Sequence, residues 1–510
     1  MSGRVHKSML NAEVNLLFYF LTLFLAFFSR RIFLECLGTE FIGLTGTLGN
    51  ILGYLNLAEL GITSCIGYFL FKPLQAKNRQ EIQDILSLLG YLYNWIGCII
   101  FAGGVLISLF FPFIFAKAEL GLGIIYFAYF SFMGSSLIGY FINYRQILLT
   151  ADQKNYLVAI YFQSARIMKI ILQIFLAYTY QNLYVWVGVE FLFGIIGCII
   201  LNWKINKEYP WLNVDKSRGK SLLKQYPEII TKTKQVFIHK LKDFALIKSD
   251  ELFIFLFVSL KMVAYYGNYM IVISKLISLF SAVTGSIGAS VGNLVAEGNK
   301  QSMMKVFWEL TTIQHTISAI LCFSLYSFLE PFIVHWLGSE YILDNRILIL
   351  LIIFVYITNS RKSVDNFNYA HGLYADVWSA WAELIINVSI TLIAGFKWGI
   401  IGILLGKNAS LLAIVVFWKP YYLFSSGFKE SVFIYWKGVI RNYSISIFAF
   451  AIATYAIRYV PINPYHSIWE WALYAAIGMV IFLSIDLSAT LLFAKGAKDS
   501  LSRIKNIRKK

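Results

Sequence analysis

Residues Ile96–Phe115 read IGCIIFAGGVLISLFFPFIF, an uncharged and largely apolar run of 20 residues. That is the length that a helix needs to cross a hydrocarbon core of about 30 Å. The run does not alternate between apolar and polar residues, as the strands of a membrane barrel do. Only helices and closed barrels satisfy their backbone groups in lipid, so this stretch predicts a transmembrane helix.

Comparable runs follow one another along the whole chain, which is 58% hydrophobic and only 14% charged. They predict an all-α, polytopic membrane protein with about fourteen transmembrane helices. We expect the spans at 14–34, 42–71, 86–115, 120–150, 156–180, 183–203, 237–260, 262–290, 305–329, 343–369, 376–396, 398–418, 439–459 and 468–494.

Most Lys and Arg residues lie in every second loop between these spans. The net charge of +17 is therefore spread over loops, and no basic domain with a nucleic-acid-binding motif is recognisable. Loops rich in Lys and Arg stay on the cytoplasmic side of a membrane. An even number of spans then places both termini in the cytoplasm. No cleavage site follows the first span, so we expect it to be retained.

Two pairs of short motifs indicate an internal duplication. Ala76–Gln80 resembles Ala296–Gln301, and Asn143–Asp152 resembles Asn368–Asp376, both at an offset of about 220–225 residues. Six spans separate the copies, so the two lobes would share one orientation and be pseudo-symmetric. The predicted organisation is a six-helix lobe at 1–203, a basic cytoplasmic linker at 204–236, a second six-helix lobe at 237–425, and two extra helices with a basic tail at 426–510.

Cationic side chains inside the spans carry the functional signal. Arg166 lies about twelve residues beyond Lys154, near the middle of its span, and Lys169 follows at i+3 on the same helical face. A charge at that depth costs about 2.5–3.5 kcal/mol and usually faces a cavity or a partner. One interpretation is an interhelical salt bridge, with Glu190 or Glu59 as the acid. The other is a cationic wall for an anionic substrate.

Four further cations complete the predicted substrate-binding set. Lys275 and Lys407 lie well inside their spans, whereas Arg30 and Arg31 close the first span. Lys407 follows Gly402 and Gly406, a small-residue stripe that is typical of close helix packing, so its direction stays open.

The span at 237–260 is the least apolar of the fourteen. Either it lines a cavity, as we expect, or its first turns lie at the membrane interface. Its Asp243 and Asp250 are seven residues apart and thus nearly stacked on one helical face. A carboxylate there could bind a coupling proton or sodium ion. The predicted coupling-ion residues are Asp243, Asp250, Glu251 and Glu59.

Several kinds of chemistry are not expected. The five cysteines are scattered and the six histidines show no metal spacing, so we predict neither a metal centre nor another cofactor. The longest soluble segment, near Asn202–Gln235, is too short for a nucleotide-binding domain. The largest outer loop, Glu330–Leu343, is too short to carry the catalytic residues of a polysaccharide polymerase or glycosyltransferase. The sequence therefore favours a transporter over an enzyme or a scaffold.

A series of short motifs resembles the bacterial polysaccharide exporters of the Wzx type. These motifs occur in the family's order over nearly the whole chain: Arg31–Phe33, Leu37–Leu44, Leu57–Ile62, Lys72–Leu74, Asp152–Tyr156, Tyr266–Tyr269, Ser290–Asn293 and Gly372–Tyr374. The broader superfamily includes MATE-type multidrug exporters and peptidoglycan-precursor flippases.

The resemblance implies two six-helix lobes around a central cavity and a flippase activity. Its substrate would be an undecaprenyl-pyrophosphate-linked oligosaccharide, moved from the cytoplasmic to the outer leaflet of the bacterial inner membrane by alternating access. Membrane lipids, and a polysaccharide polymerase with other assembly proteins, are the implied partners. The alternatives are a MATE-type multidrug or cation antiporter, which would favour an acidic cavity, and a peptidoglycan-precursor flippase.

Overall fold

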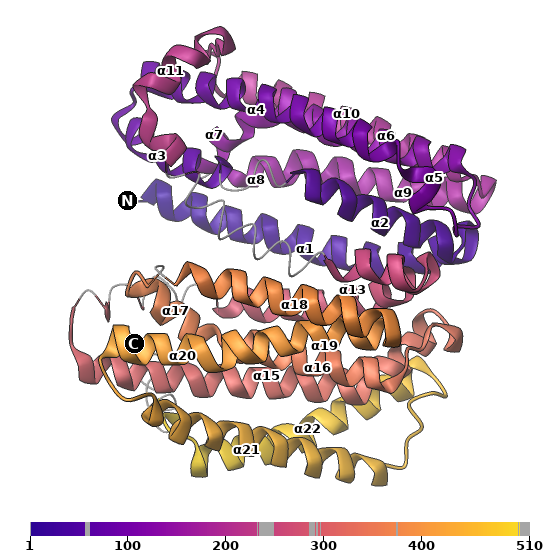
Figure 1. Ribbon diagram of the computed structural model, residues 1–510, viewed down its shortest axis with the longest axis vertical. Coiled ribbons are helices and arrows are strands. Elements are labelled where there is room, and N and C mark those ends of the chain that lie inside the picture. The colour runs from indigo at the N-terminus through magenta and orange to yellow at the C-terminus, as the bar shows by residue number, and fades with distance from the viewer. Residues whose placement is uncertain are drawn as a thin grey trace. The chain divides into compact units, whose positions relative to one another are not determined.

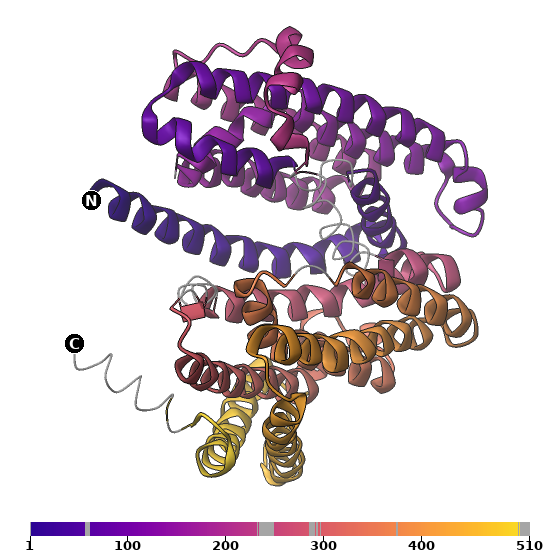
Figure 2. The same ribbon diagram turned by 60° about the vertical axis from the view of Figure 1, so that its left-hand side comes forward.

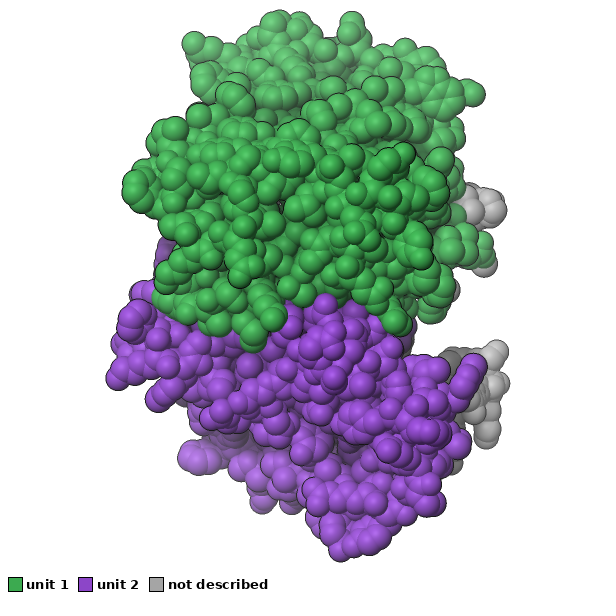
Figure 3. Space-filling model, turned by 90° about the vertical axis from the view of Figure 1, so that its right-hand side faces the viewer, with its two compact units in different colours: residues 1–264 green, residues 265–510 purple. Residues whose placement is uncertain are grey.

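The computed structural model describes residues 2–56, 62–152, 154–231, 233, 249–284, 291, 294–295, 297–373, 376–497 and 499. The regular structure of these residues is entirely helical. The chain divides into two compact units, unit 1 at Met1–Ala264 and unit 2 at Tyr265–Lys510 (Figure 3). The prediction of an all-α polytopic membrane protein is confirmed.

Twelve helices in the described residues are long and apolar enough to cross a membrane. They correspond to twelve of the fourteen predicted spans. The other two, at 42–71 and 237–260, include residues 57–61 and 237–248, which lie outside the described residues. The count of fourteen therefore stays a prediction. Large apolar side chains such as Phe396 point outward from these helices, as lipid contact requires.

Unit 1 is built around long helices joined by short helical segments. Its elements are α1 (Ser2–Leu37), α2 (Thr39–Leu55), α3 (Ile62–Ala76), α4 (Arg79–Ser108), α5 (Phe111–Ile114), α6 (Leu122–Phe141), η2 (Asn143–Arg145), α7 (Gln146–Ala151), α8 (Asn155–Val158), the π-helical η3 (Ala159–Gln163), α9 (Ser164–Tyr180), α10 (Leu183–Glu208), η4 (Lys216–Arg218) and α11 (Gly219–Gln225). Figure 1 shows α4, α6 and α10 running alongside one another, and α9 packs on α10.

Unit 2 begins within α13 (Leu260–Thr284). Its further elements are α15 (Lys300–Trp336), η5 (Ser339–Tyr341), α16 (Asn345–Ser360), α17 (Lys362–Ala370), α18 (Val377–Trp398), α19 (Ile400–Ser410), the π-helical η6 (Leu411–Trp418), α20 (Lys419–Tyr422), the π-helical η7 (Leu423–Phe428), α21 (Val432–Ala456), η8 (Ile457–Tyr459) and α22 (Ile468–Phe493). The pair α21 and α22, seen together in Figures 1 and 2, packs on α15.

Glycine sets the closest helix contact in unit 2. A Cβ atom at Gly402 would clash with the carbonyl oxygen of Ala394, and one at Gly406 would clash with the side chain of Thr391. Helices in lipid associate through such close packing, because the surrounding tails are as apolar as the helix surface. The interpretation of Gly402 and Gly406 as a packing stripe is thus confirmed, with α18 as the helix that they meet.

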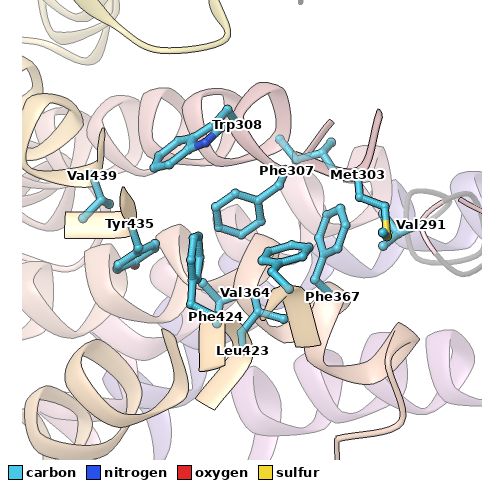
Figure 4. Close-up of a cluster of buried hydrophobic side chains, with 12 residues drawn as sticks. Val291, Met303, Phe307, Trp308, Val364, Phe367, Leu423, Phe424, Tyr435 and Val439 are labelled. Carbon is cyan, nitrogen blue, oxygen red and sulfur yellow. The ribbon is translucent and has the colours of Figure 1, made fainter. Parts of the chain in front are cut away.

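An aromatic cluster fills one part of unit 2 (Figure 4). The ring of Phe307 on α15 lies 5.5 Å, centroid to centroid, from the rings of Phe367, Phe424 and Phe428. The ring of Tyr435 of α21 lies 5.6 Å from that of Phe424 and is tilted against it. The cluster ties α15, α17, η7 and α21 together, which fixes the start of the C-terminal helix pair on the rest of the unit.

Two asparagines start corresponding helices in the two units. The side chain of Asn78 accepts a hydrogen bond from the backbone N–H of Glu81 at the start of α4, 3.2 Å away. Asn299 accepts one from the N–H of Ser302 at the start of α15, 3.0 Å away. Such caps satisfy backbone donors that a helix leaves free. The two residues lie 221 positions apart, within the offset that the duplication predicts.

The predicted domain limits, 1–203, 204–236, 237–425 and 426–510, stay predictions. Unit 1 extends to Ala264 and so includes helical residues 249–257, which the sequence assigned to the second lobe.

Candidate functional site

A pocket of about 480 Å³ with several polar and charged lining residues lies in unit 1, between α6, α9 and α10. The spans that form it are otherwise largely apolar. Its lining residues are Ser135, Ser136, Gly139, Asn143, Gln146, Phe162, Ala165, Arg166, Lys169, Glu190, Phe193, Gly194, Gly197 and Cys198. The predicted pair Arg166 and Lys169 thus shares one pocket, as their i+3 spacing indicates.

Lys169 is held by an ion pair across the pocket. Its Nζ lies 2.5 Å from Oε1 of Glu190 on the neighbouring helix α10. The other carboxylate oxygen accepts a hydrogen bond from Gln173 Nε2 at 3.0 Å. Gln173 also donates to the carbonyl oxygen of Trp186, which fixes the amide. The salt-bridge interpretation is therefore observed for Lys169, with Glu190 as the acid.

Arg166 differs from its neighbour. It is exposed and forms no hydrogen bond or ion pair with any residue that the structure describes. It lies near the middle of the span Tyr156–Tyr180. Arg166, Lys169 and Glu190 are the charged lining residues, two cations and one carboxylate, so the pocket keeps one net positive charge.

A series of side-chain hydrogen bonds starts at Asn143 and Cys198 in the wall of the pocket. Asn143 donates to Sγ of Cys198 at 2.9 Å and accepts a hydrogen bond from Asn202. Arg145 then donates to Oδ1 of Asn202 at 2.7 Å and to Oδ1 of Asn206 at 2.9 Å. This chain links the pocket to the end of α10.

The sequence prediction missed the polar wall on α6 and the segments that follow it. Ser136, Gly139, Asn143 and Gln146 repeat every three or four residues and line the pocket together. Three of them, with Asn56, Tyr93 and others, also line an adjoining pocket of about 280 Å³. The helical spacing of small and polar residues within an apolar span was the signal that would have identified this face.

The other predicted substrate-binding residues lie elsewhere. Arg30 donates to the carbonyl oxygen of Ala264 at 3.1 Å, and Arg31 forms an exposed pair with Glu35. Neither lines the pocket. Their role in binding substrate stays a prediction.

Two predicted cations belong to unit 2. Lys275 is half-buried on α13. Lys407 on α19 is 3% exposed, and its ammonium lies 4.3 Å from the ring centroid of Phe354, a cation–π contact. The structure therefore gives Lys407 a packed environment, whereas Arg166 in unit 1 is exposed.

The predicted coupling residues are only partly within the described residues. Glu59 and Asp243 lie outside them. Asp250 is buried, and Glu251 accepts a hydrogen bond of 2.5 Å from Asn50 of α2. These two carboxylates thus sit in unit 1 close to α2, and their role with a coupling ion stays a prediction.

A cluster of acidic and basic side chains lies at the C-terminal end of α10. Lys154 Nζ lies 2.8 Å from Asp152 and 2.7 Å from Glu208, and the hydroxyl of Tyr209 donates to Asp152 at 2.8 Å. Burial of the ammonium acts to lower the pKa of Lys154, but the hydrogen bonds to Asp152 and Glu208 outweigh it and leave that pKa raised. Burial first, and then the charge of Asp152, raises the pKa of Tyr209.

Unit 2 contains a corresponding arrangement. Asp376 lies 224 residues after Asp152. Its Oδ2 accepts from Trp418 Nε1 at 3.0 Å and from Lys419 Nζ at 2.7 Å. Asp152 thus accepts from Tyr209 at the end of α10, and Asp376 accepts from Trp418 and Lys419 at the end of the last span of the predicted second repeat.

Comparisons with solved structures identify the fold. The chain is similar to the lipid II flippase MurJ in its inward closed conformation, with a TM-score of 0.64 and 15% identity over 93% of this chain and 99% of that one. It is also similar to an inward-facing MATE multidrug resistance transporter of the MOP superfamily, with a TM-score of 0.62 and 12% identity over 81% of this chain and 95% of that one. The chain has the fold of these membrane transporters. At these identities the likeness concerns the fold alone.

No protein-family model matches the sequence, and no curated protein matches it either. The coarser part of the sequence prediction, a membrane transporter fold of the MATE-like kind, is thus supported by structure. The Wzx-type resemblance stays a prediction.

Proposed function

We propose that the protein is a flippase for an undecaprenyl-pyrophosphate-linked oligosaccharide. It would move this lipid from the cytoplasmic to the outer leaflet of a bacterial inner membrane by alternating access, with both termini in the cytoplasm. The oligosaccharide would be a repeat unit of an O-antigen, a capsule or an exopolysaccharide. The observation that carries the proposal is Arg166, an exposed cation near the middle of a span in a pocket of net positive charge.

The chemistry of this pocket suits a pyrophosphate. A guanidinium presents several N–H donors in a planar fork, which matches phosphate oxygens. The amide and hydroxyl groups on the opposite wall offer further donors to phosphate or sugar. In surroundings of low dielectric constant, one uncompensated positive charge attracts an anion strongly. The lipid tail would remain in the bilayer while the head group enters the pocket.

The charge also separates the competing functions. An antiporter of cationic drugs would need a carboxylate available to its substrate, but Glu190 is already bound by Lys169 and Gln173. A peptidoglycan-precursor flippase shares the pyrophosphate, and one structural relative bears the name of a lipid II flippase. The motifs of the Wzx type favour the oligosaccharide carrier over the peptidoglycan precursor.

Other features complete the proposal. Asp250 and Glu251 are proposed to bind a coupling proton or sodium ion, together with Asp243 and Glu59. Lys275, Arg30 and Arg31 are proposed to extend the cationic surface that meets the substrate, whereas the packing of Lys407 over Phe354 favours a structural role for that lysine. A polysaccharide polymerase and other assembly proteins are the proposed partners on the outer side of the membrane.

A transport assay tests the proposal. Purified protein in liposomes would be given a fluorescent polyprenyl-pyrophosphate-linked disaccharide, and its movement between leaflets would be followed. Arg166→Ala should lower the rate by about 10–100-fold, because a hydrogen bond to a charged group contributes about 1.5–3 kcal/mol. Arg346→Ala, at an exposed ion pair of unit 2, is the control and should transport normally.

A double variant separates binding from folding. Lys169→Gln with Glu190→Gln removes the ion pair but leaves Arg166 and the net charge of +1. Transport per folded molecule should persist in this variant. If Arg166→Ala transports as fast as the unaltered protein, the proposed function is wrong.

A further inference from the structure

Unit 2 contains a buried carboxyl group, which is not among the residues that line the unit 1 pocket. Asp486 on α22 is 1% exposed, and neither of its oxygens has a hydrogen-bond partner among the described residues. It lies seven residues before Phe493, the end of the helix, or roughly 10 Å along the axis at about 1.5 Å per residue. An ionised carboxylate inside a span costs about 2.5–3.5 kcal/mol even on a lenient scale, so such residues are usually functional.

Two contacts define what Asp486 faces. The ring of Phe482, one turn earlier on α22, stacks on Phe323 of α15 at 4.6 Å. Just after the C-terminal end of α22, Thr312 of α15 donates to the carbonyl oxygen of Lys495 at 2.7 Å. Asp486 therefore lies against the stretch of α15 between Thr312 and Phe323.

A chain of hydrogen bonds crosses this stretch. His315 of α15 has its Nδ1 2.9 Å from the hydroxyl of Tyr356 on α16. That hydroxyl lies 2.9 Å from Oγ of Ser446 on α21. Tyr356 packs against the same buried cluster as Ile485, the residue before Asp486, so the carboxyl and this chain lie in the same part of unit 2. Four helices thus contribute one ionisable or hydroxyl group each.

Other ionisable side chains lie near this chain of hydrogen bonds, among them Cys322 of α15, whose Sγ lies 3.5 Å from the carbonyl oxygen of Ile352. Tyr443 of α21 packs edge-on against the ring of His315 and beside the ring of Tyr356. Lys437 and Arg441 of α21 act on Lys495, which follows the end of α22.

Glu309 is an acidic residue of α15 near the C-terminal end of α22. Its backbone lies against Gly496. Among the described residues, neither oxygen of Asp486 has a hydrogen-bond partner, a basic side chain included.

We propose that Asp486 is a proton-binding site, neighboured by His315, Tyr356 and Ser446. A proton adds to one carboxylate oxygen and gives a neutral carboxylic acid, which removes the cost of a buried charge. A change in the packing of α21 and α22 on α15 then releases the proton to water. In a flippase, as proposed above, this binding would couple transport to the proton gradient; only that last step rests on the proposed function.

A proton fits the site better than a sodium ion. Hard metal cations need several oxygen ligands at short range. Phe482 precedes Asp486 by one turn on the buried face of α22, and Ala449 and Ala453 are the buried residues of α21 in the same core cluster. These apolar neighbours supply no such oxygens, and the hydroxyls of Tyr356 and Ser446 already bond to each other. A proton needs only the carboxylate itself.

Infrared spectroscopy of the purified protein in lipid nanodiscs tests the site without any substrate. The unaltered protein should show a protonated-carboxyl band that persists to higher pH than the bands of solvent-exposed carboxyls. Asp486→Asn should lose this band, and Tyr356→Phe should keep it but shift its midpoint. Thr490→Ala, one turn along the same buried face, should leave it unchanged. A band that survives in Asp486→Asn would overturn the proposal, as would a midpoint that moves with sodium concentration at constant pH.

The transport assay with an imposed pH gradient then tests coupling. Gradient-driven movement of the pyrophosphate-linked lipid should fall at least 10-fold in Asp486→Asn, while thermal stability and abundance stay unchanged. Full gradient response in this variant would exclude a coupling role. If the unaltered protein binds the proton but never moves the lipid, the proposed function fails and the proton site stands.

Discussion

Unit 1 and unit 2 each carry charged side chains within membrane spans, but these side chains differ in their exposure. In unit 1, Arg166 is exposed in a pocket and Lys169 forms an ion pair beside it. In unit 2, Lys407 is packed over Phe354 and Asp486 is almost completely buried. A hydropathy pattern counts these four residues alike. Their exposure separates a site that can meet a large head group from sites that only a proton or a neighbouring side chain can reach.

Glycine substitutions should give the largest difference between the units. Gly406→Leu would drive a side chain into Thr391 of α18, so we expect a loss of stability of at least about 3 kcal/mol, the upper end for overpacked cores. Gly139→Ala in the unit 1 pocket meets no atom within 4 Å and should leave stability unchanged. Thermal unfolding of the two variants in detergent measures the contrast. Equal stability of both would mean that α18 and α19 are not closely packed.

Lys407→Met should have a smaller effect of a different kind. Methionine fills a similar volume but loses the cation–π contact with Phe354, which is worth about 0.5–2 kcal/mol. We expect a modest fall in melting temperature and normal transport per folded molecule. The matched comparison is Arg166→Ala, for which we expect lost transport at normal stability. Lost transport at unchanged stability in Lys407→Met would instead assign this lysine to substrate binding.

The smallest effect should come from the loop between α21 and α22. The hydrogen bond to Glu470 raises the pKa of His466 above its ordinary value of 6.5. A raised pKa means that the protonated form stabilises the fold, fully below the ordinary pKa, and that this contribution disappears as pH rises through the folded value. The melting temperature of His466→Gln should therefore fall below that of the unaltered protein at pH 5–6 and match it at alkaline pH. A difference that grows with pH would contradict the assignment.

The sequence predicted much of the fold because apolar length is a local property. Twelve helices match twelve predicted spans, although α15 runs from Lys300 to Trp336, well beyond the predicted 305–329. It passes through Pro331, which has no backbone N–H to donate. Membrane helices accommodate a proline because neighbouring groups satisfy the carbonyl that it leaves without a partner. Hydropathy locates the centre of a span but not the turns that extend beyond the bilayer.

The site was only partly predictable, because partners come from distant helices. The i+3 spacing of Arg166 and Lys169 was enough to place them on one face, and Glu190 was among the acids considered. The polar stripe through Ser136 and Asn143 was missed, since each residue alone is unremarkable in an apolar span. Asp486 was missed for a similar reason: its neighbours on α15, α16 and α21 become visible only in three dimensions.

The central claim is that Arg166 gives the unit 1 pocket its preference for an anionic head group. The most direct test is equilibrium binding to the purified protein in nanodiscs, with a fluorescent polyprenyl pyrophosphate compared with the corresponding polyprenol. At low ionic strength the pyrophosphate should bind at least about 10-fold more tightly, because a charge-assisted hydrogen bond contributes about 1.5–3 kcal/mol. Arg166→Ala should abolish most of this preference. If the variant retains the full preference, the anion is bound elsewhere and the account of the pocket is wrong.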